Sequence, residues 1–183
     1  RCAAKDGGLM AVIEAIETIY LEADAALVTF DLSSSPANTY EHLQFRISAR
    51  CDRASNPHDA ILLNFNNDTG TNYSNHSIYA GNTAKGAQPS TGDSAVVVWG
   101  VSAQSLAATV YAGIVVDILD YRNGSKNTTI QYSAGSEPAA YTLYFGSGLW
   151  DATAAVTEID LTVHNGTDFI RGSEFTLYGL NSS

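Results

Sequence analysis

Residues 41–50, EHLQFRISAR, show the strictest two-residue alternation in the chain. One side of an extended strand would carry Leu43, Phe45, Ile47 and Ala49, while the other side would carry only polar or charged side chains. This pattern predicts a β-strand with one face on the core and one face in water. It makes a β-rich fold the starting expectation.

Similar runs recur along the rest of the chain. Alternation returns in LVTFDL (27–32), AVTEIDLTV (155–163) and SEFTLYGL (173–180). Four more apolar runs predict strands that are buried on both faces, namely AILLNF (60–65), AVVVWGV (95–101), VYAGIVVDIL (110–119) and YTLYF (141–145). Clusters of Gly, Pro, Asn and Ser separate these runs. We therefore expect an all-β fold of about ten strands, an antiparallel β-sandwich with a jelly-roll-like arrangement.

The 183 residues suit a single domain. We expect residues 16–183 to form that domain and residues 1–15 to form an N-terminal arm or extension. Residues 1–9 precede the first clear pattern and are read as a leader, an arm or a misassigned start. Residues 8–19 contain the one helix candidate, although its second half fits a first strand equally well.

The charge balance argues against two classes of partner. Nine basic residues face nineteen acidic ones, so the formal net charge is −10. A nucleic-acid partner needs a Lys/Arg patch, and the scattered basic residues provide none. An anionic membrane surface is disfavoured for the same reason. The sequence also has no apolar run of about 18 residues, which is the length a membrane-spanning helix needs.

Asp117 and Asp120 are the first candidates for a catalytic pair. Residues three apart on a regular strand lie on opposite faces, so these two carboxylates cannot act together. Asp120 precedes Asn123 and Gly124, which are typical of a hairpin turn, and it is expected to accept hydrogen bonds from turn amides. Asp117 needs a partner if it is buried, and Arg46, Arg50 or a Tyr could supply one.

The other candidate sites favour structural roles. NFNNDTGTN (64–72) resembles a calcium loop only faintly, because its glycine is one residue late and no Glu follows in place. A turn built on Asn and Asp hydrogen bonds is the better interpretation. Glu158 and Asp160 share a strand face that is expected to meet solvent. No catalytic residue, metal site or cofactor is predicted, and Cys2 and Cys51 are either joined or free.

Two tyrosines remain as candidate ligand-facing residues. Flat aromatic rings such as those of Tyr73 and Tyr79 suit the faces of pyranose sugars, and polar Asn and Asp neighbours suit sugar hydroxyls. Most aromatic residues of a sandwich belong to its core instead. Tyr73 and Tyr79 are therefore retained only as possible contacts for a glycan.

Several phrases together suggest a relationship: TIYLEADAALVTFDL (18–32), TYEHLQFRISAR (39–50), FNNDTGTNYS (65–74), VVDILDYRNGSKNTT (115–129), SGLWDATAAVTEIDL (147–161) and FTLYGL (175–180). In this order they resemble a group of bacteriophage proteins, mostly described as hypothetical virion or tail-associated structural proteins. The resemblance runs from about Ile16 to Leu180. It implies a virion component, either a decoration or cement protein of the head or a part of a tail or fibre.

The leading hypothesis is thus a non-enzymatic structural protein, located in the virion, whose partners are other virion proteins. It would assemble as a homo-oligomer, with a trimer as one option. An N-terminal arm carrying Leu9, Val12, Ile13 and Ile16 would dock onto a neighbour. The alternative is a carbohydrate-binding module of a fibre that recognises host glycans. A glycoside hydrolase is a third hypothesis, which would need two facing carboxylates.

Overall fold

The computed structural model describes residues 12–82, 84–136 and 142–181. These residues form strands and loops, and they contain no helix. The strands are β1 (Val12–Tyr20), β2 (Leu27–Asp31), β3 (His42–Cys51), β4 (His58–Phe65), β5 (Tyr73–Ala80), β6 (Lys85–Asp93), β7 (Val96–Ala103), β8 (Ala112–Leu119), β9 (Thr128–Ser136), β10 (Thr142–Trp150), β11 (Glu158–Val163) and β12 (Glu174–Asn181). The all-β class expected from the sequence is therefore confirmed.

The strands form two layers, and hydrogen bonds between β3 and β7 connect these layers into one continuous sheet. The eight-strand layer is antiparallel throughout and has the order β1-β12-β3-β8-β9-β10-β5-β6. The four-strand layer has the order β2-β11-β4-β7. A short parallel pairing of Arg50 with Ser102 and of Cys51 with Ala103 joins β3 to β7. The result is one mixed, mostly antiparallel sheet, whose jelly-roll detail stays a prediction.

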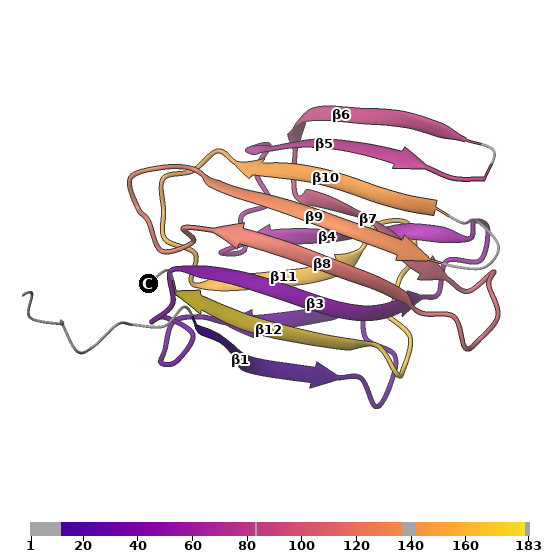
Figure 1. Cartoon of the computed structure of the whole chain (residues 1–183), viewed down its shortest axis with the longest axis horizontal. Coiled ribbons are helices and arrows are strands. Elements are labelled where there is room, and N and C mark those ends of the chain that lie inside the picture. The colour runs from indigo at the N-terminus through magenta and orange to yellow at the C-terminus, as the bar shows by residue number, and fades with distance from the viewer. Residues whose placement is uncertain (1–11, 83, 137–141, 182–183) are drawn as a thin grey trace, which may run out of the picture.

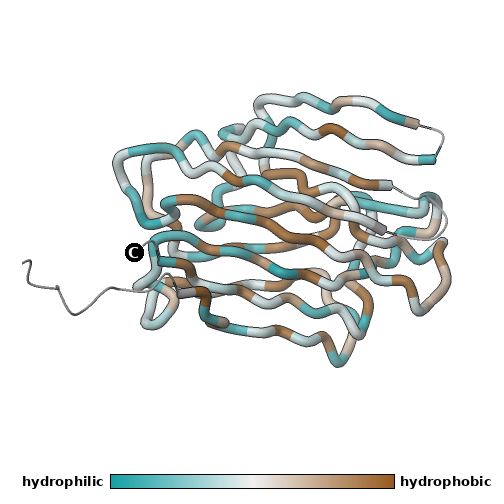
Figure 2. The backbone as a smooth tube through the Cα atoms, in the orientation of Figure 1, coloured by the Kyte–Doolittle hydropathy of each residue, from teal (hydrophilic) through white to brown (hydrophobic). Residues whose placement is uncertain are grey.

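The two layers enclose the core between them. In Figure 1, β3, β8, β9 and β10 lie in front of β4, β7 and β11. The inward residues of β3 are buried as the alternation predicts, and the Phe45 ring lies edge-on to Phe30 of β2 with centroids 5.0 Å apart. Figure 2 shows hydrophobic segments along the central strands and hydrophilic segments in many loops. Burial of this shared apolar face is what favours the fold.

Arg50 departs from the face that the sequence suggested. It is only 3% exposed, although its place in the alternation put it on the wet face. Its Nη1 donates to the carbonyls of Ala107 and Val110, and its Nη2 donates to those of Gln104 and Leu106. The loop after β7 thus closes over the guanidinium. This side chain fixes the loop, because buried carbonyl groups need donors.

The N-terminal expectations need correction from Val12 onward. Residues Val12–Tyr20 form β1, which pairs with β12 of the same chain and carries a bulge between Ala15 and Glu17. Ile16 and Ile19 pack against the core, whereas Ile13 is 55% exposed. The helix candidate is a strand over this part because β12 supplies its hydrogen-bond partners.

The arm expected over residues 1–15 therefore overlaps the sheet. Val12, Ile13 and Ile16 belong to β1, and the sheet begins before the boundary at residue 16. Leu9 and the rest of residues 1–11 lie outside the described residues. Within the described ranges, no helix has the length and apolarity needed to cross a bilayer.

Candidate functional site

Tyr73 and Tyr79 lie in different environments although both belong to β5. The Tyr73 ring is 1% exposed, and its hydroxyl accepts from the Phe65 amide and donates to the Asp68 carbonyl. Tyr73 is a core residue, so no ligand can reach its ring. Tyr79 is half-buried and lines a cleft in the surface.

That cleft, called the edge cleft below, has a volume of about 610 Å³. It is lined by residues of β5 and β6, which form one edge of the eight-strand layer in Figure 1, and by residues of β7, of β10 and of the loops before β4 and after β5. β7 pairs with β4 on one side and with β3 only at Ser102 and Ala103, and it contributes Trp99 to the cleft. The volume falls in the range typical of small-molecule sites.

Three aromatic rings form one wall of the edge cleft. Tyr144 is 3% exposed and stands at the centre of the group. Its ring centroid lies 5.8 Å from that of Tyr79 and 6.2 Å from that of Trp99, with the Trp99 ring nearly parallel to it. Gly86 of β6 leaves room for Tyr79, because a Cβ at this position would lie 2.9 Å from the Tyr79 hydroxyl oxygen. The rings are thus held by their packing.

Polar groups converge on the same cleft from the loop before β4 and from the first residue of β4. Arg53 and His58 line it, and Arg53 Nη1 binds the fully buried Asp59 at 3.2 Å. Asp59 also accepts from both nitrogens of Asn165 and from the Gly166 amide. The guanidinium is therefore already neutralised by a carboxylate that is itself fully hydrogen-bonded.

Burial favours the neutral forms of two ionisable groups of the cleft, His58 and Tyr144. Burial, aided by the Arg53 charge, lowers the pKa of His58 below its ordinary 6.5. Its Nδ1 is buried and has no hydrogen-bond partner among the described residues. Burial raises the pKa of Tyr144 to about 12. The cleft thus presents aromatic rings and amides together with Arg53, whose charge is offset by Asp59.

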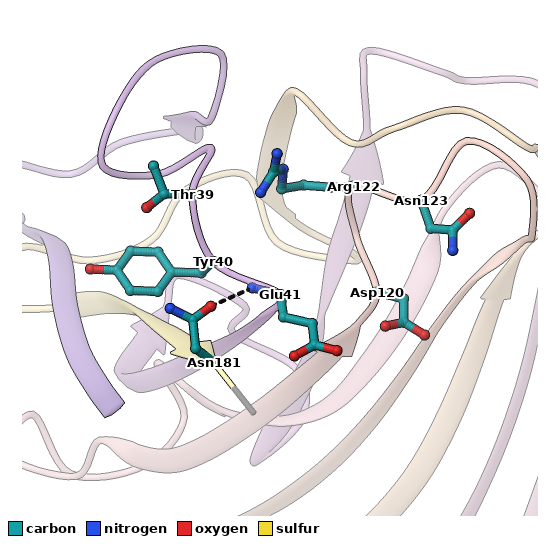
Figure 3. A pocket seen from close by; sticks show the side chains of 7 residues that line it. All are labelled: Thr39, Tyr40, Glu41, Asp120, Arg122, Asn123 and Asn181. Atoms are coloured by element: carbon teal, nitrogen blue, oxygen red, sulfur yellow. Dashed lines mark hydrogen bonds between the residues drawn. The ribbon is translucent and has the colours of Figure 1, made fainter. Parts of the chain in front are cut away.

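A second hollow of about 350 Å³ lies at the ends of β8 and β12 (Figure 3). Figure 3 shows the carboxylates of Glu41 and Asp120 near one another, and the Glu41 amide donates to Asn181 Oδ1 at 3.0 Å. Glu41, His42 and Asp120 place potential metal ligands within 4.8 Å of one another.

Existing bonds account for this group without an ion. Lys126 Nζ binds Asp120 Oδ2, and the Asp120 amide donates to His42 Nδ1. The Lys126 ammonium lowers the pKa of Asp120 and already supplies a positive charge to this carboxylate. Asp120 has a positive φ of 51°, and its carbonyl, rather than its carboxylate, accepts the Asn123 amide.

The remaining sequence candidates are dispersed. Asp117 is half-buried on the outer face of the eight-strand layer and accepts from Gln44 Nε2 at 2.7 Å, not from an Arg or a Tyr. Asp160 is only 9% exposed, contrary to the expected solvent-facing position, and accepts from Thr29 Oγ1. Glu158 accepts from Asn67. These carboxylates hold neighbouring strands and turns together.

The loop that resembles a calcium site is the expected Asx turn. Asp68 Oδ1 accepts the Gly70 amide, while Oδ2 accepts from Asn72 Nδ2 and Trp150 Nε1. Cys51 is a buried free thiol, and burial raises its pKa to about 11. Cys2 lies outside the described residues.

One surface feature was missed by reading the sequence. Ile78 of β5 pairs directly with Phe145 of β10, and Leu143 lies two residues along the same face. These three side chains, called the outer-face cluster below, are 52%, 50% and 48% exposed. YTLYF was expected to be buried on both faces, but only its inward side is covered. The direct pairing of β5 with β10, which reveals the cluster, has no signal in the sequence.

Compared with known proteins, the chain matches no family model, no curated protein and no solved structure.

Proposed function

We propose that this chain is a non-enzymatic structural component of a bacteriophage virion. It acts through protein–protein assembly, as a decoration or cement protein of the capsid or as a part of a tail or fibre. The first partner is another copy of the chain, which binds through the outer-face cluster. The contact with the rest of the particle then holds an array of such copies.

The outer-face cluster is the observation that carries this proposal. Single exposed apolar residues are common on protein surfaces, but adjacent large ones on a flat sheet are typical of interaction sites. Ile78 and Phe145 lie directly opposite one another, and their outward neighbours across the strands are Ala87 and Ser133. The cluster itself is therefore continuous and uncharged, and it is bordered by Lys85, opposite Ala80, and by Asp117, which lines a hollow beside Phe145.

The charge of the chain favours a contact at this place. With a formal net charge of −10, two copies repel one another over most of their surfaces. Contact across an uncharged apolar face avoids this repulsion and removes the Phe145 and Ile78 side chains from water. A second copy offers the same self-complementary face, as symmetric dimers require.

The roles of the carboxylates support a non-enzymatic body. Asp59, Asp68 and Asp160 each accept hydrogen bonds that join separate segments of the chain. A glycosidase needs two carboxyl groups that face one another across a substrate site. The three aspartates are instead engaged in binding Arg53, Trp150 and Thr29.

The resemblance of ordered phrases between Ile16 and Leu180 to phage structural proteins gives the proposal its biological setting. It is tested on particles of the phage that encodes the chain. Gradient-purified particles are digested, and peptides of this chain are quantified against those of the major capsid protein. A fixed copy number per particle, retained after high-salt washing, is the expected result. Presence in the infected-cell lysate but absence from washed particles would refute the proposal.

A further inference from the structure

We propose that the edge cleft is a binding site for a neutral saccharide, whose ring packs against Tyr79 and Trp99 while its hydroxyl groups bond to Gln88 and the loop before β4. This site is separate from the outer-face cluster and does not depend on the assembly proposed above. Tyr79 points to the inner side of β5, whereas Ile78 points to the outer side. The two surfaces therefore lie on opposite faces of the same strand.

The wall of the cleft suits the apolar face of a sugar ring. The C–H groups on one face of a pyranose carry partial positive charge, and the face of an aromatic ring is negative. Tyr79 and Trp99 are both half-buried, so part of each ring remains open to the cleft. Tyr144 lies between them as a buried support, 5.8 Å and 6.2 Å away. A preformed wall of this kind lowers the ordering cost of binding.

The polar groups of the cleft suit hydroxyls better than charges. Gln88 is an exposed residue of β6 that lines the cleft. Its Oε1 accepts from Ser77 Oγ at 3.4 Å, and its amide group can donate to a ligand hydroxyl. His58 also lines the cleft, and burial lowers the pKa of its imidazole, which favours the neutral form. A few polar side chains beside an aromatic wall are what a polyhydroxyl ligand can satisfy.

Charge selects neutral saccharides over acidic ones. Arg53 is the cation of the cleft among its described lining residues, and Asp59 already binds it at 3.2 Å. Beyond Gln88 and Trp99 the cleft continues into a smaller hollow that is lined by Asp93. With the overall charge of −10, these features disfavour a carboxylated or sulfated sugar.

The test uses the full chain on a printed array of neutral, sialylated and uronic-acid oligosaccharides, followed by calorimetric titration with the strongest neutral binder. We expect neutral binders, with affinity reduced by about tenfold or more in Tyr79→Ala, as for a contact residue of a small interface. Tyr79→Phe keeps the ring and should stay within about threefold of the wild type. Tyr20→Ala is the matched control, since Tyr20 is 51% exposed on the far edge strand β1.

Gln88→Ala provides a second variant that does not disturb the aromatic wall, because Gln88 is exposed. It should also weaken binding, while thermal unfolding reports that the variants remain folded. The proposal is overturned if no neutral saccharide binds, if acidic saccharides alone bind, or if folded Tyr79→Ala and Gln88→Ala bind like the wild type. Assembly on the particle is measured separately, so failure here leaves the structural role intact.

Discussion

Asp59 is a fully buried carboxylate that joins three separate segments of the chain. It binds Arg53 of the loop before β4 and accepts from Asn165 and Gly166 of the loop after β11. Replacing it with alanine would leave the Arg53 charge without its carboxylate, and three N–H groups, two of Asn165 and one of Gly166, without their acceptor. We therefore expect Asp59→Ala to lower the free energy of unfolding by about 3–5 kcal/mol, measured by denaturant titration.

Glu22→Ala is the matched control for this prediction. Glu22 also pairs with an arginine, Arg171, but both side chains of that pair are mostly exposed. Exposed pairs contribute little, so the change should stay within about 0.5 kcal/mol. Equal effects of the two substitutions would show that burial of Asp59 does not determine its contribution.

Ionised Asp68 contributes to the free energy of unfolding, and this contribution varies with pH in the acidic range. The Trp150 indole N–H, then the Asn72 amide and the Gly70 backbone amide, hold the pKa of Asp68 below its ordinary 3.8. A carboxylate with a lowered folded pKa stabilises the fold fully above its unfolded pKa, and this contribution is lost as the pH falls through the folded pKa.

We therefore expect Asp68→Asn to be less stable than the wild type near neutral pH. Its free energy of unfolding should also decline less than that of the wild type between about pH 4 and pH 2. Denaturant titrations at a series of pH values measure both effects. Parallel profiles for the two proteins would contradict the role given to Asp68.

At the level of the strands, the packing between β9 and β10 requires a residue without a side chain at position 146. Gly146 of β10 pairs with Tyr132 of β9, and a Cβ at Gly146 would lie 2.2 Å from the Tyr132 ring. Tyr132 is 4% exposed and has little room to move. Gly146→Ala should destabilise the fold by about 1–3 kcal/mol, as overpacking does.

Gly113→Ala is the control at a position of the neighbouring strand β8. A Cβ there would have no atom within 4 Å, so the free energy of unfolding should change by about 0.5 kcal/mol or less. Thermal unfolding of both variants checks the comparison. The packing argument fails if Gly146→Ala is as stable as Gly113→Ala.

The sequence predicts single strands well because the two-residue alternation of apolar and polar side chains lies within the strand's own residues. The alternation in β3 correctly identifies Leu43, Phe45 and Ile47 as core residues. Burial of the second face depends on what lies across it, which the strand itself does not encode. This is why Phe145 was expected to be buried, and why Arg50 was expected to be exposed.

Over the whole molecule, the candidate sites arise from neighbours that the sequence does not reveal. Tyr79, Trp99 and Tyr144 belong to β5, β7 and β10, and only the order of the strands brings their rings together. Tyr79 could be proposed from its residue type and polar neighbours. Tyr73 has the same residue type but lies in the core, so composition alone could not separate the two.

The outer-face cluster predicts that copies of the chain associate. Phe145 is 50% exposed, so Phe145→Ser should remove apolar contact area without disturbing the core. Tyr20→Ser removes a ring of similar exposure, 51%, from the opposite edge strand and serves as the control.

Sedimentation velocity over a range of concentrations tests this self-association most directly. The wild type and Tyr20→Ser should sediment faster as the concentration rises, whereas Phe145→Ser should remain at the monomer value throughout. A wild type that stays monomeric at every concentration, or a Phe145→Ser protein that associates as strongly as the wild type, would contradict assembly through this face.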